Sequence, residues 1–500
     1  ADYTGGRVDL SGIGAYGGAF SGKLAIEGQN LSNDWGFDGG GLHANLSGSG
    51  RVSLLDGSLI RNNRLDAQNA AGPAYANGGG LYVFHNDLNA VAMDTLGGEI
   101  RGNAASATVT TATGYDQATA EGGGAYVRGD VTALSGKLDG NTATATATDN
   151  SGAARAHGGG AYIAGNLATL SGRTNDNTAT AITTTQNVTS SAYAYGGGTY
   201  VHSNLTTLSG EASGNTATAT ADAANVYVNG GGVYVGGTFG ALSGKVLNNT
   251  AEGQSASRNA YVNGGGLYLL KGAGELGGEI SGNRAGATIL GGNYAAYAYG
   301  GGAFAQKEVT TLSGRITGNT AEGVVQGGTG YAHVYGGGAY VMEGLGTLSG
   351  TVSGNTAKAR NEVNDYYDAY AQGGGSYVYK SIAALSGTIS NNTAEARALG
   401  GTAYAFGGGV GTYENITALS GTLSGNKAKA TSTSGDAYAR GGGAYVTKSI
   451  ADVSGTITNN TVEASSGSGE AHALGGGLFV YVPDVLITKG TYANNKAIAM

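Results

Sequence analysis

Residues able to do acid–base chemistry are few and widely spaced in this 500-residue chain. Histidine exchanges protons near neutral pH, and the six histidines are His43, His85, His157, His202, His333 and His472. Only His333 and His472 stand at the same phase of the sequence repeat. They are 139 residues apart, which is four rungs, or about 19 Å at about 4.8 Å per rung. The spacing therefore gives no support to a Ser-His-Asp constellation.

The densest acidic cluster consists of Glu362, Asp365 and Asp368. It stands in a variable segment between repeats, where charged side chains are normally solvated. Weak calcium or glycan contact is the alternative interpretation. Parallel β-helices that cleave polysaccharides need a carboxylate cluster on one face, so this cluster is the only support for a lyase-like or glycosidase-like activity. We expect no enzyme activity, no catalytic residue, no metal site and no cofactor.

An asparagine recurs once per repeat. Its positions are Asn103, Asn141, Asn177, Asn215, Asn249, Asn283, Asn319, Asn355, Asn392, Asn426, Asn460 and Asn495. Amides without carboxylates are poor cation ligands, whereas amides stacked about 4.8 Å apart can hydrogen-bond from rung to rung. We therefore predict a structural asparagine ladder, with a metal site as the alternative. The residue before each asparagine is Gly, Asn or Asp, which predicts a left-handed corner there.

Two aromatic positions recur as well. The first follows the start of each glycine triplet by four residues: Tyr82, Tyr126, Tyr162, Tyr200, Tyr234, Tyr268, Phe304, Tyr340, Tyr377, Tyr445 and Phe479. The second precedes a triplet by three residues: Tyr75, Tyr193, Tyr227, Tyr261, Tyr297, Tyr370, Tyr404 and Tyr438, with His333 and His472 in phase. We predict aromatic ladders that stiffen a sheet. The functional alternative is a tyrosine strip that binds sugars or a neighbouring fibre.

The elements that carry these residues are set by glycine, which supplies 98 of the 500 residues. With 2 prolines the chain is not collagen. Glycine triplets begin at positions 39, 78, 122, 158, 196, 230, 264, 300, 336, 373, 407, 441 and 475. A period of this size is typical of solenoids and other repeat architectures. Short β-branched, alternating runs between glycines predict strands, and no segment has a helical period.

The repeats vary in length at one place only. From Gly122 to Asn460, the first glycine of a triplet and the repeated asparagine are 19 positions apart. The distance from that asparagine to the next triplet is 15, 17 or 19 positions, with a single 18. Steps of two keep both strands of a hairpin in phase, so we predict a coil of three strands that carries a β-arm of variable length. The residue after the first aromatic is usually Val, Ile or Leu, and strand alternation directs it into the core.

Composition limits the function classes. Lys and Arg number 26 against 34 Asp and Glu, which leaves no basic stripe for nucleic acid. There is no cysteine, no apolar run long enough for a transmembrane segment, and no Gly-Lys-Ser/Thr after the glycines to form a phosphate loop. The chain opens Ala1-Asp2-Tyr3 without a basic or apolar leader. We expect a mature exported chain at the cell surface or outside the cell.

The pattern resembles the right-handed parallel β-helices of Gram-negative autotransporter passengers, and most closely the repeats of polymorphic outer-membrane proteins. The family marks G-G-A-I and F-x-x-N correspond to Gly338-Ala339-Tyr340 and Ile316-Thr317-Gly318-Asn319, and similar pairs run along about 460 of the 500 residues. The third glycine, the aliphatic residue in place of Phe and the long Ala/Tyr arm depart from that pattern. The resemblance implies a surface-exposed adhesive or structural role and transfers no catalytic residue.

These observations predict an all-β, right-handed parallel β-helix with about 13 rungs of about 34–38 residues and projecting β-arms. Residues 1–38 would form a degenerate rung or partial cap containing Trp35, and residues 39–500 one continuous repeat domain. Two turns per repeat is the alternative geometry. The expected function is a non-enzymatic extracellular rod, a passenger or a fibre subunit that stacks end to end as a homo-oligomer and contacts host or matrix glycans or proteins. A carbohydrate-active or glycan-binding β-helix is the alternative.

Overall fold

One repeat makes one turn of a parallel β-solenoid. The computed structural model has about 12 such turns, and no helix occurs in the residues it describes, which are 40–70, 72–110, 116–148, 152–184, 189–364, 366–482 and 484–500 together with strands β1–β6. Nothing in this part of the chain is a helix that could cross a membrane. The chain divides into two compact units, Ala1–Glu252 and Gly253–Met500, which follow the same plan.

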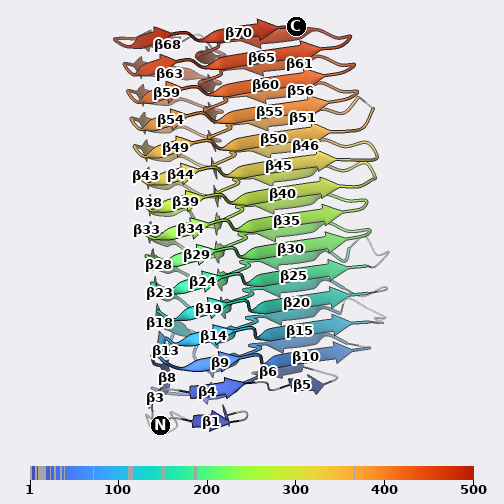
Figure 1. Cartoon of the computed structure of the whole chain (residues 1–500), viewed down its shortest axis with the longest axis vertical. Helices are drawn as coiled ribbons and strands as arrows, with labels where there is room; N and C mark the ends of the chain where they lie inside the picture. The colour runs from blue at the N-terminus through green and yellow to red at the C-terminus, as the bar shows by residue number, and fades with distance from the viewer. Residues whose placement is uncertain are drawn as a thin grey trace. The chain divides into compact units, whose positions relative to one another are not determined.

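Each turn contains five strands, and each strand joins its own parallel sheet. In the turn that starts at Gly122 they are β17 (Ala125–Arg128), β18 (Asp130–Leu134), β19 (Lys137–Asp139), β20 (Thr142–Ala147) and β21 (Ala154–His157). Strand β17 pairs with β22 (Ala161–Ile163), and Tyr126 lies opposite Tyr162, 36 residues later. The register therefore gives one turn per repeat. Figure 1 shows equivalent strands side by side.

The second unit repeats this plan. One of its turns consists of β46 (Ala332–Tyr335), β47 (Ala339–Val341), β48 (Leu345–Leu348), β49 (Thr351–Ser353) and β50 (Thr356–Asn361). Strand β50 pairs in parallel with β45 (Thr320–Val325) and with β55 (Thr393–Ala398), without a register shift.

Short strands also occur before the first described triplet. They are β1 (Tyr3–Gly5), β2 (Val8–Asp9), β3 (Ala19–Gly22), β4 (Leu24–Glu27), β5 (Asn30–Asn33) and β6 (Gly36–Asp38). Strand β4 pairs with β9 (Leu59–Arg61) and β5 with β10 (Arg64–Asn69), so this stretch continues the parallel sheets. Trp35 lies outside the described residues.

The variable tract forms two strands per turn, as its odd spacings predict, but the pairing differs from that of a hairpin. Strand β20 pairs with its counterparts β15 (Ala104–Val109) and β25 (Thr178–Thr183), and β21 pairs with β26 (Ala192–Tyr195). In the described residues β20 and β21 share no sheet. Parallel stacking satisfies the backbone groups of both strands along both edges, whereas an isolated hairpin would leave its outer edges unpaired. Each arm is thus an extension of the solenoid wall.

Alternation along the strands builds the core. The aliphatic residues after the first aromatic position, such as Val83, Val127 and Ile163, are fully buried, which confirms the expected orientation. In the arm, alternate alanines face inward: Ala143 and Ala145 of β20 and Ala156 of β21 have no exposed surface. Small side chains therefore fill most of the space between the two arm strands, with larger ones such as Leu65 and Ile289 in single turns.

The predicted left-handed corner is confirmed in every repeat. Positive φ angles occur at Gly102, Gly140, Asp176, Gly214, Asn248, Gly282, Gly318, Gly354, Asn391, Gly425, Asn459 and Asn494, with values between 53° and 65°. An earlier turn has the same corner at Asn62, with a φ of 56°. The corner ends one strand and begins the next, and it places the following asparagine inside the wall.

Candidate functional site

The repeated asparagines form a continuous hydrogen-bonded ladder within each unit. Asn141 is fully buried, and both its backbone N–H and its Nδ2 donate to Oδ1 of Asn177 at 2.9 Å. Its Nδ2 also donates to the carbonyl of Ile100 at 2.8 Å. Its own Oδ1 accepts from the backbone N–H and Nδ2 of Asn103, both at 3.0 Å. The amide therefore uses both donors and both lone pairs within the wall, which suits a structural role.

The ladder has one more rung than the sequence pattern identified. In the first unit it runs through Asn63, Asn103, Asn141, Asn177, Asn215 and Asn249. In the second unit it runs through Asn283, Asn319, Asn355, Asn392, Asn426, Asn460 and Asn495. Asn63 was missed, although Asn62-Asn63 has the same form as Asn248-Asn249.

A second polar ladder, partly buried at Asp130 and Asn166 and exposed at Asn204 and Thr238, was not apparent from the sequence. The backbone N–H of Asn166 donates to Oδ1 of Asp130 at 2.7 Å, and Nδ2 of Asn204 donates to Oδ1 of Asn166 at 2.8 Å. The backbone N–H of Thr238 then donates to Oδ1 of Asn204 at 2.8 Å. These residues lie at the start of equivalent strands of successive turns or directly before them, but their types differ, so they do not stand out as a repeat.

The first aromatic position forms a column of ring contacts on the outer side of the wall. The rings are stacked in the first unit, whereas successive rings from Phe304 to Tyr377 are tilted by 37–55°. The rings of Tyr126 and Tyr162 are 5.2 Å apart and inclined by 1°, and those of Tyr200 and Tyr234 are 4.5 Å apart and inclined by 5°. Nevertheless Tyr200 and Tyr234 are only 7% exposed. Burial raises the pKa of Tyr162 and Tyr234 and favours their neutral phenol forms.

The burial has a cause that the sequence pattern did not reveal. In several turns the residue immediately before the glycine triplet is aromatic, and its ring contacts the first aromatic column. Tyr195 stacks on Tyr234 at 5.4 Å, and Tyr335 lies 5.0 Å from Tyr377. Burial in this layer raises the pKa of Tyr335 to about 12. The residue type at this position changes along the chain and includes Glu121 and Arg440, so the sequence shows no repeated aromatic residue there.

The residue before the triplet also supplies a ring in the one turn where the first aromatic position is a glycine. Gly411 stands where a Tyr or Phe is expected, and a Cβ atom there would lie 2.8 Å from the Tyr377 ring. Phe406, from the position before the triplet, stacks on Tyr445 at 4.8 Å. Phe406 thereby supplies a ring in the turn that lacks one on β57 (Val410–Thr412).

The second aromatic position forms a column of partly exposed rings. In the second unit its members are Tyr261, Tyr297, His333, Tyr370, Tyr404, Tyr438 and His472, with centroid separations of 4.5–5.4 Å. In the first unit Tyr193 and Tyr227 stack at 5.1 Å. Tyr75 does not join them, because Thr119 and Arg155 occupy the intervening turns. The ring faces cover one another, so mainly edges and hydroxyl groups meet solvent.

The acidic cluster is not assembled into one site in the described residues. Asp368 accepts a hydrogen bond from the Tyr370 hydroxyl at 2.9 Å and another from the backbone N–H of Thr402 at 2.9 Å. Glu362 pairs with Arg360 at 3.5 Å. Asp365 lies outside the described residues. No group of three His, Asp or Glu side chains suited to a metal ion occurs in the part of the chain that the structure describes.

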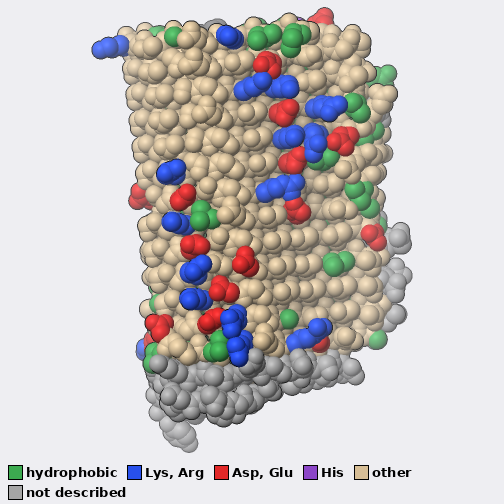
Figure 2. All heavy atoms as spheres, in the orientation of Figure 1, with side chains coloured by type: hydrophobic (Ala, Val, Ile, Leu, Met, Phe, Trp, Pro, Cys, Tyr) green, Lys and Arg blue, Asp and Glu red, His purple; other side chains and the backbone are tan. Residues whose placement is uncertain are grey.

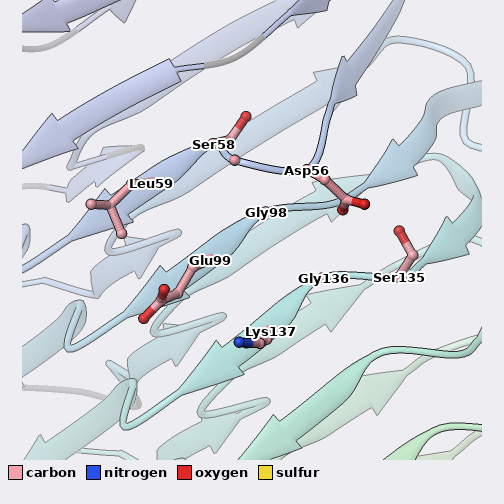
Figure 3. Close-up of a pocket in the computed structure, with 9 residues that line it drawn as sticks. Asp56, Ser58, Leu59, Gly98, Glu99, Ser135, Gly136 and Lys137 are labelled. Carbon is pink, nitrogen blue, oxygen red and sulfur yellow. The ribbon is translucent and has the colours of Figure 1, made fainter.

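A shallow depression of about 470 Å³ lies on the first unit. Its lining spans three adjacent turns and includes Asp56, Ser58, Glu99, Ser135 and Lys137 (Figure 3). Glu99 and Lys137 are partners in register, and Glu99 is also bonded to Arg101 at 3.0 Å. The depression presents carboxylate, hydroxyl and ammonium groups to a small polar molecule, and one of its carboxylates, Glu99, is already paired with Arg101.

The recurring asparagines and aromatic residues thus make their hydrogen bonds and ring contacts with the equivalent residues of neighbouring turns. Comparison of the chain with family models, with curated proteins and with solved structures gives no match.

Proposed function

We propose that the chain is a non-enzymatic structural or adhesive module of the cell surface or extracellular space, related in role to the autotransporter passengers it resembles. The observation that carries the proposal is the use of the recurring polar residues. The asparagine side chains are bonded to neighbouring turns, and most members of the two aromatic ladders are stacked on one another. Repetition of this kind stiffens a scaffold and leaves these residues little freedom for catalysis.

We further propose that copies assemble end to end. The ladder is directional, because each asparagine donates to the one in the following turn. Two copies joined in this polarity would meet head to tail, and a head-to-tail contact that does not close into a ring gives a filament.

The turn that ends the given sequence has apolar residues at the same core positions as the turn before it. Ile487 lies opposite Val453, and Tyr492 lies opposite Ile457. Val453 and Ile457 are fully buried, whereas Ile487 is 58% exposed and Tyr492 41% exposed. Any further turn stacked on this one would cover both residues, and end-to-end assembly predicts that a second copy supplies it. A turn supplied by the same polypeptide is the competing outcome.

Electron microscopy of the purified native protein tests the assembly, and surface labelling of intact cells tests the location. Ile487→Lys places a charge at the core edge and should abolish filaments. Leu486→Lys is the matched control, because Leu486 is 59% exposed on the same strand, β68 (Asp484–Ile487), but occupies the alternate, outward position. Short monodisperse particles at every concentration, or equal loss in both variants, would contradict end-to-end assembly. Absence of surface labelling would contradict the location.

Glycan binding or cleavage is the second candidate, and the partly exposed second aromatic column favours it. Since the ring faces are stacked on one another, a sugar would have to bind through tyrosine hydroxyls and ring edges. Screening against host and matrix polysaccharides tests this candidate, with Asp368→Ala as the variant. Absence of binding and degradation on all of them would remove it.

A further inference from the structure

One face of the first unit carries a regular array of threonines. It is formed by the outward positions of β15, β20, β25 and β30 (Thr216–Ala221), and we call it the threonine face. Nine of its twelve positions are threonine: Thr108, Thr142, Thr144, Thr146, Thr178, Thr180, Thr216, Thr218 and Thr220. The other three are Ala104, Ser106 and Ile182. All twelve side chains are partly exposed, and the residues between them are buried.

The array is periodic in two directions. Thr144 lies opposite Thr180, and Thr180 opposite Thr218, with no register shift along the three strand pairs. Neighbouring strands are about 4.8 Å apart, and alternate residues of one strand about 6.6 Å apart. The four strand arrows run alongside one another without visible fanning in Figure 1. The result is a nearly rectangular net of hydroxyl and methyl groups.

The threonine side chains are held in fixed positions, and their hydroxyl groups are available for hydrogen bonds to water. Threonine is β-branched, so its χ1 angle is restricted on a strand. Buried alanines such as Ala145 and Ala181 fix the backbone from below. Among the described residues, none of the nine threonine hydroxyls makes a hydrogen bond to another protein group. Their bonding capacity is therefore directed to solvent at fixed positions.

The threonine face is also free of charge. None of its twelve residues is ionisable, and Figure 2 shows mostly tan surface with isolated green side chains on the strands labelled β15 to β30 in Figure 1. In the second unit the equivalent sheet carries alternating charges in register, at Glu322, Lys358, Glu395, Lys429 and Glu463. Glu322 there also bonds Arg284 at 3.0 Å and Arg360 at 2.7 Å. The neutral face is thus a property of four particular turns.

We propose that the threonine face binds ice. Hexagonal ice presents on its prism faces a neutral rectangular net of oxygen atoms with repeats close to the two spacings of the array. A preorganised net loses little conformational entropy when the water next to it adopts those positions. Hydroxyl groups would hydrogen-bond the bound water layer, and methyl groups would fill the spaces between its oxygens. A charged or glycan partner would need charged groups or ring faces, which this surface lacks.

The test uses the full chain and measures thermal hysteresis, ice-crystal shape and incorporation of the fluorescently labelled protein into growing ice. We expect faceted crystals and measurable hysteresis for the wild type. Thr180→Tyr, at the centre of the array, should abolish both. Ile182→Thr completes the row between Thr146 and Thr220 and should increase hysteresis.

Thr356→Tyr is the matched control, because Thr356 is a partly exposed, outward threonine in the equivalent sheet beside Lys358. It should leave hysteresis unchanged. Circular dichroism and protease resistance establish that each variant is folded. A folded wild type without hysteresis or ice incorporation, or equal activity in Thr180→Tyr and the wild type, overturns the proposal. Binding to crystalline chitin or cellulose in the absence of ice activity overturns it as well.

Discussion

Gly124 packs so closely against the side-chain amide of Asn141 that no side chain fits at position 124. A Cβ atom on Gly124 would lie 2.8 Å from Cγ of Asn141 and 2.5 Å from the carbonyl oxygen of Gly160 in the next turn. The third glycine of the triplet therefore leaves the space in which the ladder amide lies. The same relation recurs between Gly338 and Asn355, with 2.9 Å to Cγ. The glycine triplet and the asparagine ladder are parts of one structural device.

This contact predicts that Gly124→Ala is strongly destabilising. The added methyl group overlaps a backbone oxygen and a fully buried amide, neither of which can rotate away. We expect the free energy of unfolding to fall by about 3 kcal/mol, the upper range for overpacking a core. Urea unfolding followed by circular dichroism measures the change. A loss below about 1 kcal/mol would show that the wall relaxes around the methyl group.

Gly140, in the same turn, separates backbone strain from overlap. Its φ is 62°, and a Cβ atom there would meet nothing within 4 Å. Gly140→Ala should cost about 1–2 kcal/mol, the strain of an L-residue in the left-handed region. Gly140→Asn should cost less, because Asn248 and Asn391 occupy the equivalent corner at φ values of 53° and 56°. Equal losses for the two substitutions would contradict this explanation.

The corner and the ladder were predictable because each position accepts only a narrow set of residue types. Only Gly, Asn and Asp precede the repeated asparagine, and that restriction by itself indicates a positive φ at this position. The amide of Asn177 has a fixed partner in each neighbouring turn, so its repetition at fixed spacing is informative. The inward direction of Val127 follows from alternation alone.

The pairing within the arm and the outer aromatic layer were not predictable in this way. The odd spacings require only that two strands keep phase, and a hairpin and two stacked sheets satisfy that equally. Tyr335 and Phe406 belong to a position whose residue type changes from turn to turn, so no periodic signal marks it. Their contacts with Tyr377 and Tyr445 depend on the angle between two strands, which a sequence pattern does not contain.

The buried asparagine ladder and the second polar ladder offer a direct comparison of hydrogen bonds. Asn177→Ala removes the acceptor for two buried donors of Asn141 and the donor to the carbonyl of Leu138. Each unsatisfied buried group costs about 1–3 kcal/mol, so the two stranded donors alone predict a loss of about 2–6 kcal/mol. Chemical denaturation monitored by tyrosine fluorescence measures it.

Asn204→Ala is the control for that substitution. Asn204 makes the same kind of contact, with Nδ2 2.8 Å from Oδ1 of Asn166, but it is exposed. Water can replace the lost bonds there, and the expected loss is below about 1 kcal/mol. Similar losses in the two variants would mean that burial does not determine the strength of the ladder.

His333 predicts a pH dependence of stability. It lies between the rings of Tyr297 and Tyr370, with Tyr331 and Tyr335 beside it, and burial lowers its pKa to about 4. The unfolded chain has a histidine pKa of about 6.5 and therefore binds more protons than the native state between these values. The contribution of His333 is constant above pH 6.5, and stability is lost as the pH falls from 6.5 towards 4.

His333→Tyr removes this loss while keeping a ring in the column. Above pH 7 the free energy of unfolding of the variant and of the wild type should change with pH in the same way. Between pH 6.5 and 4 the wild type should lose stability relative to the variant as the pH falls. The free energy of unfolding, measured by urea titration at several pH values, provides the comparison. Tyr370→His is the reciprocal variant and should steepen the loss, because it places a second histidine between stacked rings. Parallel pH curves for the wild type and His333→Tyr would show that the imidazole is protonated as readily in the folded column as in the unfolded chain.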